Sequence, residues 1–129
     1  MIAVDTSALV AIVLGEPELE RFAAIMASRP CVVSAASITE AALVVQTRQG
    51  PDAVEDLRRV LQQAKVAIAP VDDEQAWSAH AAWQRFGKGR HPAGLNFGDC
   101  FSYALAKSRA VPLLYKGDDF TQTDIEPAR

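Results

Sequence analysis

Short apolar runs alternate along the chain with longer segments of mixed polarity. Runs at residues 1–4, 31–34, 66–70 and 111–115 each have the length of a buried strand. Between them, apolar residues recur at spacings of three and four, as in Val54, Leu57 and Leu61, which is typical of helices. The pattern therefore predicts helices over residues 5–15, 16–29, 35–50, from Pro51 onward, over 72–87 and from Asn96 onward.

This order of elements indicates an α/β fold. Short, wholly apolar strands that alternate with helices are typical of a parallel sheet covered on both faces. Right-handed crossovers then give a three-layer α/β/α domain, with a central sheet of about four or five strands. No repeat or linker divides the chain, so we expect residues 1–129 to form a single domain.

Two details of the helices can be checked directly. Pro17 should lie in the first turn of the helix that begins at residue 16, where proline is well tolerated. Trp77, Trp83 and Phe86 fall at helical spacings, and we expect all three in the core.

Composition and charge exclude several kinds of binding site and indicate where the protein is located. A formal charge of −3 excludes a generally basic nucleic-acid surface, so any such contact would need a local patch. The longest apolar run, residues 7–15, is too short to span a bilayer, and no basic segment precedes it. Cys31 and Cys100 lack the spacing of a zinc site. We expect reduced thiols, a cytoplasmic location and no membrane partner.

Acidic residues follow the predicted strands in a way that brings them to one edge of the sheet. Asp5 directly follows the first strand, and Glu40 lies about one and a half helical turns beyond the second. Asp99 is in the first turn of the helix that leads to the fourth strand, which Asp118 and Asp119 follow. Ligands of such folds bind at this edge, beyond the carboxyl ends of the strands.

Each acid also has an ordinary structural explanation. Asp5 could cap a helix, Glu40 could form a capping box with Ser37, and Asp99 could form one with Asn96. The stretch KGDD, residues 116–119, could be a simple turn. Together, however, carboxylates at one edge would repel one another unless a cation neutralised them. Oxygen ligands without nearby His or Cys favour Mg²⁺ or Mn²⁺ over zinc.

Three stretches carry a resemblance to a known family. AVDTSAL near the start, GLNFGDCFSYALA late in the chain and LLYKGDDFTQTDI near the end resemble the PIN-domain ribonucleases, and more closely the VapC-type toxins of bacterial type II toxin–antitoxin pairs. The resemblance covers the whole chain. It implies a Mg²⁺- or Mn²⁺-dependent endoribonuclease in which metal-activated water cleaves RNA. Its metal ligands and catalytic residues would be Asp5, Glu40, Asp99 and Asp118.

The resemblance also implies supporting residues and partners. Asp119 is the alternative to Asp118 as the fourth acid, and Thr6 or Ser7 could orient Asp5 or a bound water, or simply cap the helix. A VapB-like antitoxin would occupy the helical hairpin of residues 8–26 and block the site, and the toxin would be a homodimer.

A cationic loop just before Asp99 suggests where RNA phosphates bind. Arg85, Lys88, Arg90 and His91 lie close together in the sequence, and an acidic metal centre needs nearby cations to hold a polyanion. The alternative is an ordinary solvated loop.

Two other functions fit part of the pattern. A PIN-like domain whose acids serve only as caps would be an inert binding module. A receiver-like phosphoacceptor domain also places acids and Mg²⁺ at strand ends, but it needs an acidic pair after the first strand. Here Asp5 is followed by Thr6 and Ser7, which makes that alternative the poorer one.

Overall fold

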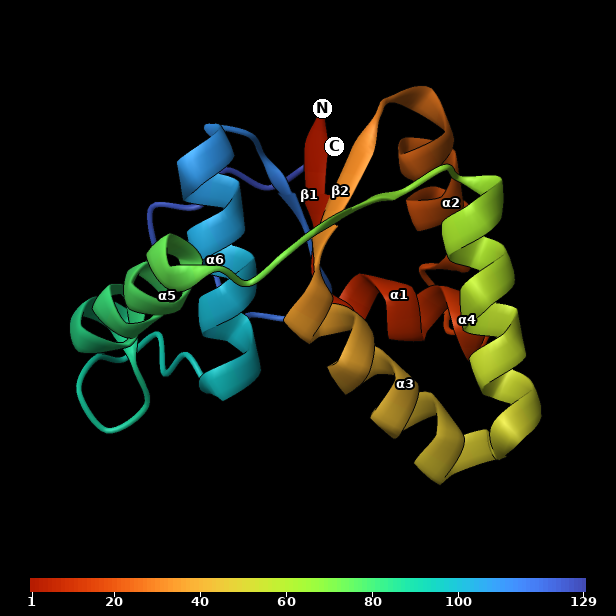
Figure 1. Ribbon diagram of the computed structural model, residues 1–129, viewed down its shortest axis with the longest axis horizontal. Coiled ribbons are helices and arrows are strands. Elements are labelled where there is room, and N and C mark those ends of the chain that lie inside the picture. Colours follow the sequence, from red (N-terminus) through yellow and green to blue (C-terminus); the bar gives the residue numbers. More distant parts are fainter.

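The computed structural model describes residues 1–129 and contains a parallel sheet with helices on both faces (Figure 1). The sheet has four strands in the order β3-β2-β1-β4. The elements in chain order are β1 (Ile2–Val4), α1 (Thr6–Val13), α2 (Leu19–Ser28), β2 (Cys31–Ser34), α3 (Ala35–Gln49), α4 (Pro51–Gln63), β3 (Ala67–Ala69), α5 (Asp73–Phe86), α6 (Phe97–Arg109) and β4 (Leu113–Leu114).

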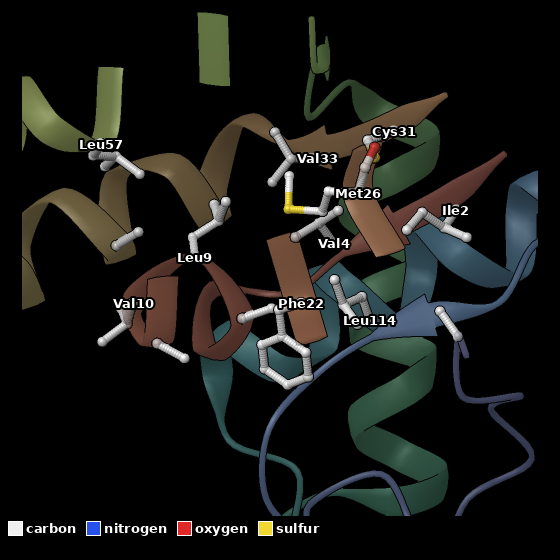
Figure 2. Packing of buried hydrophobic residues seen from close by; sticks show 14 of the residues in the cluster. Ile2, Val4, Leu9, Val10, Phe22, Met26, Cys31, Val33, Leu57 and Leu114 are labelled. Carbon is white, nitrogen blue, oxygen red and sulfur yellow. The ribbon is translucent and has the colours of Figure 1, made fainter. Parts of the chain in front are cut away.

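Alternate residues of β1, β2 and β4 enter two separate cores, which confirms the three-layer α/β/α fold. Ile2, Val4 and Val33 pack with residues of α1 to α4 on one face (Figure 2). Ala3 and Val32 pack with residues of α5 and α6 on the other. This period of two follows from the pleat of the strands. Both cysteines are buried and free, and no helix has the length and apolarity needed to cross a membrane.

Helix starts follow local capping signals. Pro51 occupies the first turn of α4, directly after Gly50, whose φ of +85° suits glycine. Asn96 and Asp99 form a complete capping box at the start of α6, because each side chain accepts the other's backbone N–H. The predicted helices 35–50 and 72–87, and the start of α6, are therefore confirmed.

Other details of the prediction are wrong. Helix α2 begins at Leu19, so residues 16–18, including Pro17, form the turn before it. Gly15 with φ of +68° starts that turn, and Glu16 and Glu18 pair there with Lys116. Strand β3 is at the edge of the sheet, and two of its three residues are exposed.

The prediction that both tryptophans belong to the core is also wrong. Trp77 is 66% exposed and Trp83 is 39% exposed, whereas Phe86 is buried. The buried face of α5 consists of Ala79, Ala82 and Phe86, at spacings of three and four. A helix advances about 100° per residue, so Trp77 lies about opposite Phe86.

The register of the sheet brings the start of α1 next to the end of β4. Val4 pairs with Leu114, and the backbone N–H of Asp5 donates to the Leu114 carbonyl at 2.9 Å. The loop after β4 is then held to α1 because the Lys116 backbone N–H donates to the Ser7 hydroxyl at 2.9 Å. The residues that follow β1 and β4 therefore meet at one edge.

Candidate functional site

Asp5 is a buried carboxylate at the junction of β1 and α1. It is 4% exposed, and it caps α1 by accepting the backbone N–H of Ser7 at Oδ2. The Ser7 hydroxyl donates to the same oxygen at 2.7 Å. Ser7 thus joins Asp5 to the loop after β4, and its hydroxyl orients the carboxylate. The neighbouring Thr6 hydroxyl instead donates to the Ser37 carbonyl at 3.2 Å.

The second oxygen of Asp5 is held from α6. The Ser102 hydroxyl donates to Asp5 Oδ1 at 2.5 Å, and Ser102 is 1% exposed. The hydroxyls of Ser37 and Ser102 are 3.3 Å apart. Because the Ser102 proton is used toward Asp5, Ser37 is the donor of that pair. Three elements, α1, α3 and α6, therefore fix the orientation of one carboxylate.

Asp99 is a buried carboxylate in the first turn of α6. Its Oδ2 accepts the Asn96 backbone N–H at 3.0 Å, yet the residue is only 7% exposed. Burial, with a smaller contribution from the negative charges of Asp5 and Asp119, raises the pKa of Asp99 to about 8, although the Asn96 bond acts in the opposite direction. Asp99 therefore serves as a helix cap and also lies in a crowded acidic environment.

Of the two acids that follow β4, Asp119 is the one that acts on this cluster. Its charge and a side-chain hydrogen bond both raise the pKa of Asp99. Both acids are exposed, and Asp118 contributes its backbone carbonyl, which accepts the N–H and the hydroxyl of Thr121. KGDD thus forms a turn as well as placing one acid beside Asp99.

Glu40 approaches the same turn of α6 from α3. A Cβ on Gly98 would lie 2.2 Å from Glu40 Oε2, so any other residue there would displace this carboxylate from its present position. The capping box predicted for Ser37 and Glu40 is wrong, because α3 begins one turn earlier and its N-cap is Ser34. Glu40 is half-buried, and it has no capping function.

This arrangement fits a hard divalent cation with a largely aqueous ligand shell. No three His, Cys, Asp or Glu side chains lie close enough together to hold a metal ion by themselves. Mg²⁺ is usually bound by one or two carboxylates and several waters, which the buried pair of Asp5 and Asp99 can provide. Burial, and then the charges of Asp5 and Asp119, raise the pKa of Asp99 and so disfavour its ionised form, a cost that a bound cation would relieve.

The cations predicted to bind RNA lie along α5 and its following loop, and none of them pairs with these acids. Arg85 pairs with Asp124 at 3.5 Å, and the Arg90 guanidinium lies 4.8 Å from the centre of the Trp83 ring. His91 Nδ1 accepts the Ala93 backbone N–H at 3.0 Å. Lys88 is exposed and forms no salt bridge.

Comparison with known proteins identifies the family. Residues 2–126 match the PIN domain. The chain belongs to the PIN-domain family. This PIN domain is 50% identical over 123 residues to Ribonuclease VapC30 of Mycobacterium tuberculosis, covering 95% of this chain and 94% of that protein. It is 49% identical to Ribonuclease VapC of Mycolicibacterium smegmatis, covering 95% of each chain.

Solved structures agree with the fold of this PIN domain. Mycobacterium tuberculosis VapC20, described as a sarcin-ricin loop cleaving toxin, superposes with a TM-score of 0.80 at 21% identity, covering 100% of this chain and 99% of that one. A toxin–antitoxin complex from Klebsiella pneumoniae gives 0.72 at 18% identity, covering 96% and 93%. The strand order 3-2-1-4 also differs from the 2-1-3-4-5 order of receiver domains, so the receiver-like alternative is wrong.

Sequence reasoning missed three residues of the site: Ser37, Gly98 and Ser102. Ser102 had a usable signal, because a hydroxyl three residues after Asp99 lies on the same face of a helix within an otherwise apolar run. Ser37 was recognised, but as the wrong cap. The close approach of Gly98 to Glu40 depends on the packing of α3 against α6, which no local pattern encodes.

Proposed function

We propose that this PIN domain is a Mg²⁺- or Mn²⁺-dependent endoribonuclease that acts as the toxin of a type II toxin–antitoxin pair. The observation that carries the proposal is the pair of buried carboxylates, Asp5 and Asp99, at the carboxyl edge of the sheet. Relatives about 50% identical over nearly the full chain are named VapC ribonucleases, which supports RNA as the substrate.

The residues divide into direct ligands and groups that act through water. Asp5 and Asp99 would hold the cation directly, whereas Glu40 and Asp119 would bind its waters. When bound, the cation supplies a water of lowered pKa and polarises the scissile phosphate. Ser7 and Ser102 keep both oxygens of Asp5 oriented, in the way that hydrogen bonds to metal-binding carboxylates usually do.

Asp119 takes the place of Asp118 in this proposal because it is the acid that acts on Asp99. Asp118 therefore supplies a matched control one residue away. A binding module whose acids served only as caps would need no second carboxylate beside a buried cap, since placing two there raises the pKa of Asp99. That cost favours the enzyme over the inert module.

Cleavage of single-stranded RNA by the purified protein tests the proposal. The wild type should cleave with Mg²⁺ or Mn²⁺, lose activity in EDTA and regain it when metal is returned. Asp5→Asn and Asp119→Asn should reduce cleavage, and Asp118→Asn should not. Cleavage that persists in EDTA, or that survives Asp5→Asn in full, would contradict the proposal.

An apolar surface groove, formed by the helical hairpin of α1 and α2 together with α4, suits a protein partner. It has a volume of about 850 Å³ and runs between the end of α1, α2 and α4, with Ile12, Leu19, Ala23, Met26 and Val60 in its lining. Grooves of this kind accept the apolar face of an amphipathic helix. We propose that a VapB-like antitoxin binds here, and that the toxin forms a homodimer.

Adjacent alanines of α2 allow a matched test of antitoxin binding. Ala23 lines the groove, whereas the neighbouring Ala24 is exposed outside it. Ala23→Arg should abolish co-purification with the small protein encoded beside the toxin gene, and Ala24→Arg should not. Equal retention of that partner by both variants would exclude this groove, and light scattering of the toxin alone tests the homodimer.

A further inference from the structure

An aromatic groove lies between α5 and α6, on the side of α6 away from Asp99. Its volume of about 500 Å³ falls within the ~300–1,000 Å³ range of small-molecule sites. Phe97 and Phe101 line it, and at about 100° per residue they are roughly opposite Asp99 on the helix. His80 and Trp83 line it from α5.

The aromatic side chains of the groove are exposed but fixed in place. Phe97 is 82% exposed and contacts Phe101 edge-on at 5.0 Å. The Trp83 indole lies against Gly87, where a Cβ would come within 2.3 Å of the ring, and Arg90 covers the ring at 4.8 Å. An exposed phenylalanine beside an ordered indole is a preformed surface for stacking a planar ligand.

The charge of the groove differs from that of the molecule as a whole. The formal charge of the chain is −3, but no acid lines the groove. Lys88 lines it and forms no salt bridge, and Arg90 lies beside it on Trp83. Aromatic faces with adjacent cations are the combination by which proteins bind single-stranded RNA, through stacked bases and neutralised phosphates.

The groove and the acidic site meet at the first turn of α6. Asn96 lines the groove, and its backbone N–H donates to Asp99 Oδ2 at 3.0 Å. Phe97 immediately precedes Gly98, which lies against the Glu40 carboxylate. A strand of RNA bound at the carboxylates therefore reaches the groove by passing the first turn of α6.

We propose that this groove binds a nucleobase of the RNA next to the scissile phosphate, with Phe97 as the stacking residue and Lys88 contacting the adjoining phosphate. The proposal rests on the proposed function, because it assigns a subsite for that substrate. The cations, and the link through Asn96 to the Asp99 carboxylate, favour RNA over a second copy of the chain as the occupant.

RNA affinity in EDTA, where cleavage cannot proceed, tests the subsite. The probe is a fluorescein-labelled single-stranded RNA of about 12 nucleotides and mixed sequence, within the usual range of single-strand sites. Phe97→Ala should weaken binding about tenfold, the loss expected for one stacked base, and Phe97→Tyr should restore it. Trp77→Ala is the control, because Trp77 is also exposed to solvent on α5 but does not line the groove, and the affinity of this variant should equal that of the wild type.

An abasic scan of the same RNA locates the base. Removing one base at a time should weaken binding to the wild type most at a single position beside the cleavage site, and that position should have little effect on Phe97→Ala. Wild-type affinity in Phe97→Ala would overturn the proposal, and so would an equal loss in Trp77→Ala. A changed oligomeric state of Phe97→Ala with unchanged RNA affinity would assign the groove to a second copy instead.

These outcomes separate the subsite from the enzyme. If the wild type cleaves RNA but Phe97→Ala binds as well as the wild type, only the subsite is wrong. If the wild type neither binds nor cleaves RNA, the proposed function fails and the subsite fails with it.

Discussion

Helices α5 and α6 each begin at an Asp or Asn cap, but in different surroundings. At the start of α5, Asp72 accepts the Gln75 backbone N–H at 2.8 Å, and the carboxylate is exposed. At the start of α6, Asn96 is the cap and Asp99 completes the box, but Asp99 is buried beside Asp5 and Asp119. Capping thus explains all of what Asp72 does and only part of what Asp99 does. The surrounding acids, and not the local motif, distinguish the two turns.

The largest expected difference between the two turns is in catalysis. Asp99→Asn should reduce metal-dependent cleavage by at least about 10³-fold, because it removes a charged ligand whose cation contributes several kcal/mol. Asp72→Asn changes the same atoms at an exposed cap and should cleave as the wild type does. Initial rates on one RNA substrate measure both variants. Equal rates for the wild type and Asp99→Asn would show that Asp99 is only a helix cap.

A smaller effect is expected at Ser102, on the Asp99 side of α6. Ser102→Ala removes the donor to Asp5 Oδ1, and loss of such a supporting bond typically costs about 10–100-fold in metal affinity or activity. Ser108→Ala is the control on the same helix, since Ser108 is exposed and donates to the Leu105 carbonyl. The measurement is the metal concentration that gives half-maximal cleavage. That concentration should rise in Ser102→Ala if Ser102 orients the Asp5 carboxylate, and it should stay unchanged if Ser102 has only a structural role.

The burial of Asp99 should also make the stability of the metal-free protein depend on pH. Folded Asp99 keeps its proton up to about pH 8, whereas the unfolded chain loses it near the ordinary value of 3.8. Unfolding therefore releases a proton between those values, and the free energy of unfolding contributed by Asp99 falls as pH rises through that window. Asp99→Asn lacks this loss, so in EDTA its melting temperature should exceed the wild-type value at pH 8.5.

The difference in melting temperature between Asp99→Asn and the wild type should be smaller in acid. At pH 4.5 most of the Asp99 contribution is restored to the wild type, so the two melting temperatures should approach each other. Circular dichroism melts at the two pH values give the result. A constant difference between wild type and Asp99→Asn at both values would show that burial of the charge at Asp99 does not affect stability.

The smallest effect belongs to the exposed cap. Asp72→Ala removes the bond to Gln75 and should lower the free energy of unfolding by about 1 kcal/mol, the usual cost of losing a helix cap. Urea denaturation measures this loss, and RNA cleavage should be unaffected. A much larger loss would mean that Asp72 also has tertiary contacts.

The elements that sequence predicted well are those with strong local signals. The four apolar runs became the four strands, and Pro51 and the Asn96–Asp99 box marked helix starts. The start of α2 was missed because Glu16 and Glu18 pair with Lys116, more than 90 positions away in the sequence. The tryptophans were wrongly assigned to the core because the prediction considered their apolar character and not their angular position on the helix. At about 100° per residue, Trp77 lies opposite Phe86.

The residues of the candidate site also fall into those that local sequence predicts and those that only tertiary packing reveals. The placement of Asp5 and Asp99 at one sheet edge was predictable, because Asp5 directly follows β1 and Asp99 lies in the first turn of α6. The proposed choice of Asp119 over Asp118 needs the structure, because adjacent residues of a turn differ only in direction. Trp83 and Phe97 were not predicted as ligand-binding residues, since their exposure depends on how α5 packs against α6.

Calorimetric titration with Mn²⁺ tests the central claim most directly, because it needs no RNA and no partner. The account predicts that the wild type and Asp72→Asn bind Mn²⁺ with the same affinity, and that Asp99→Asn binds it far more weakly or not at all while remaining folded. Equal Mn²⁺ affinity in folded wild type and Asp99→Asn would contradict the claim that the buried carboxylate pair is a metal site.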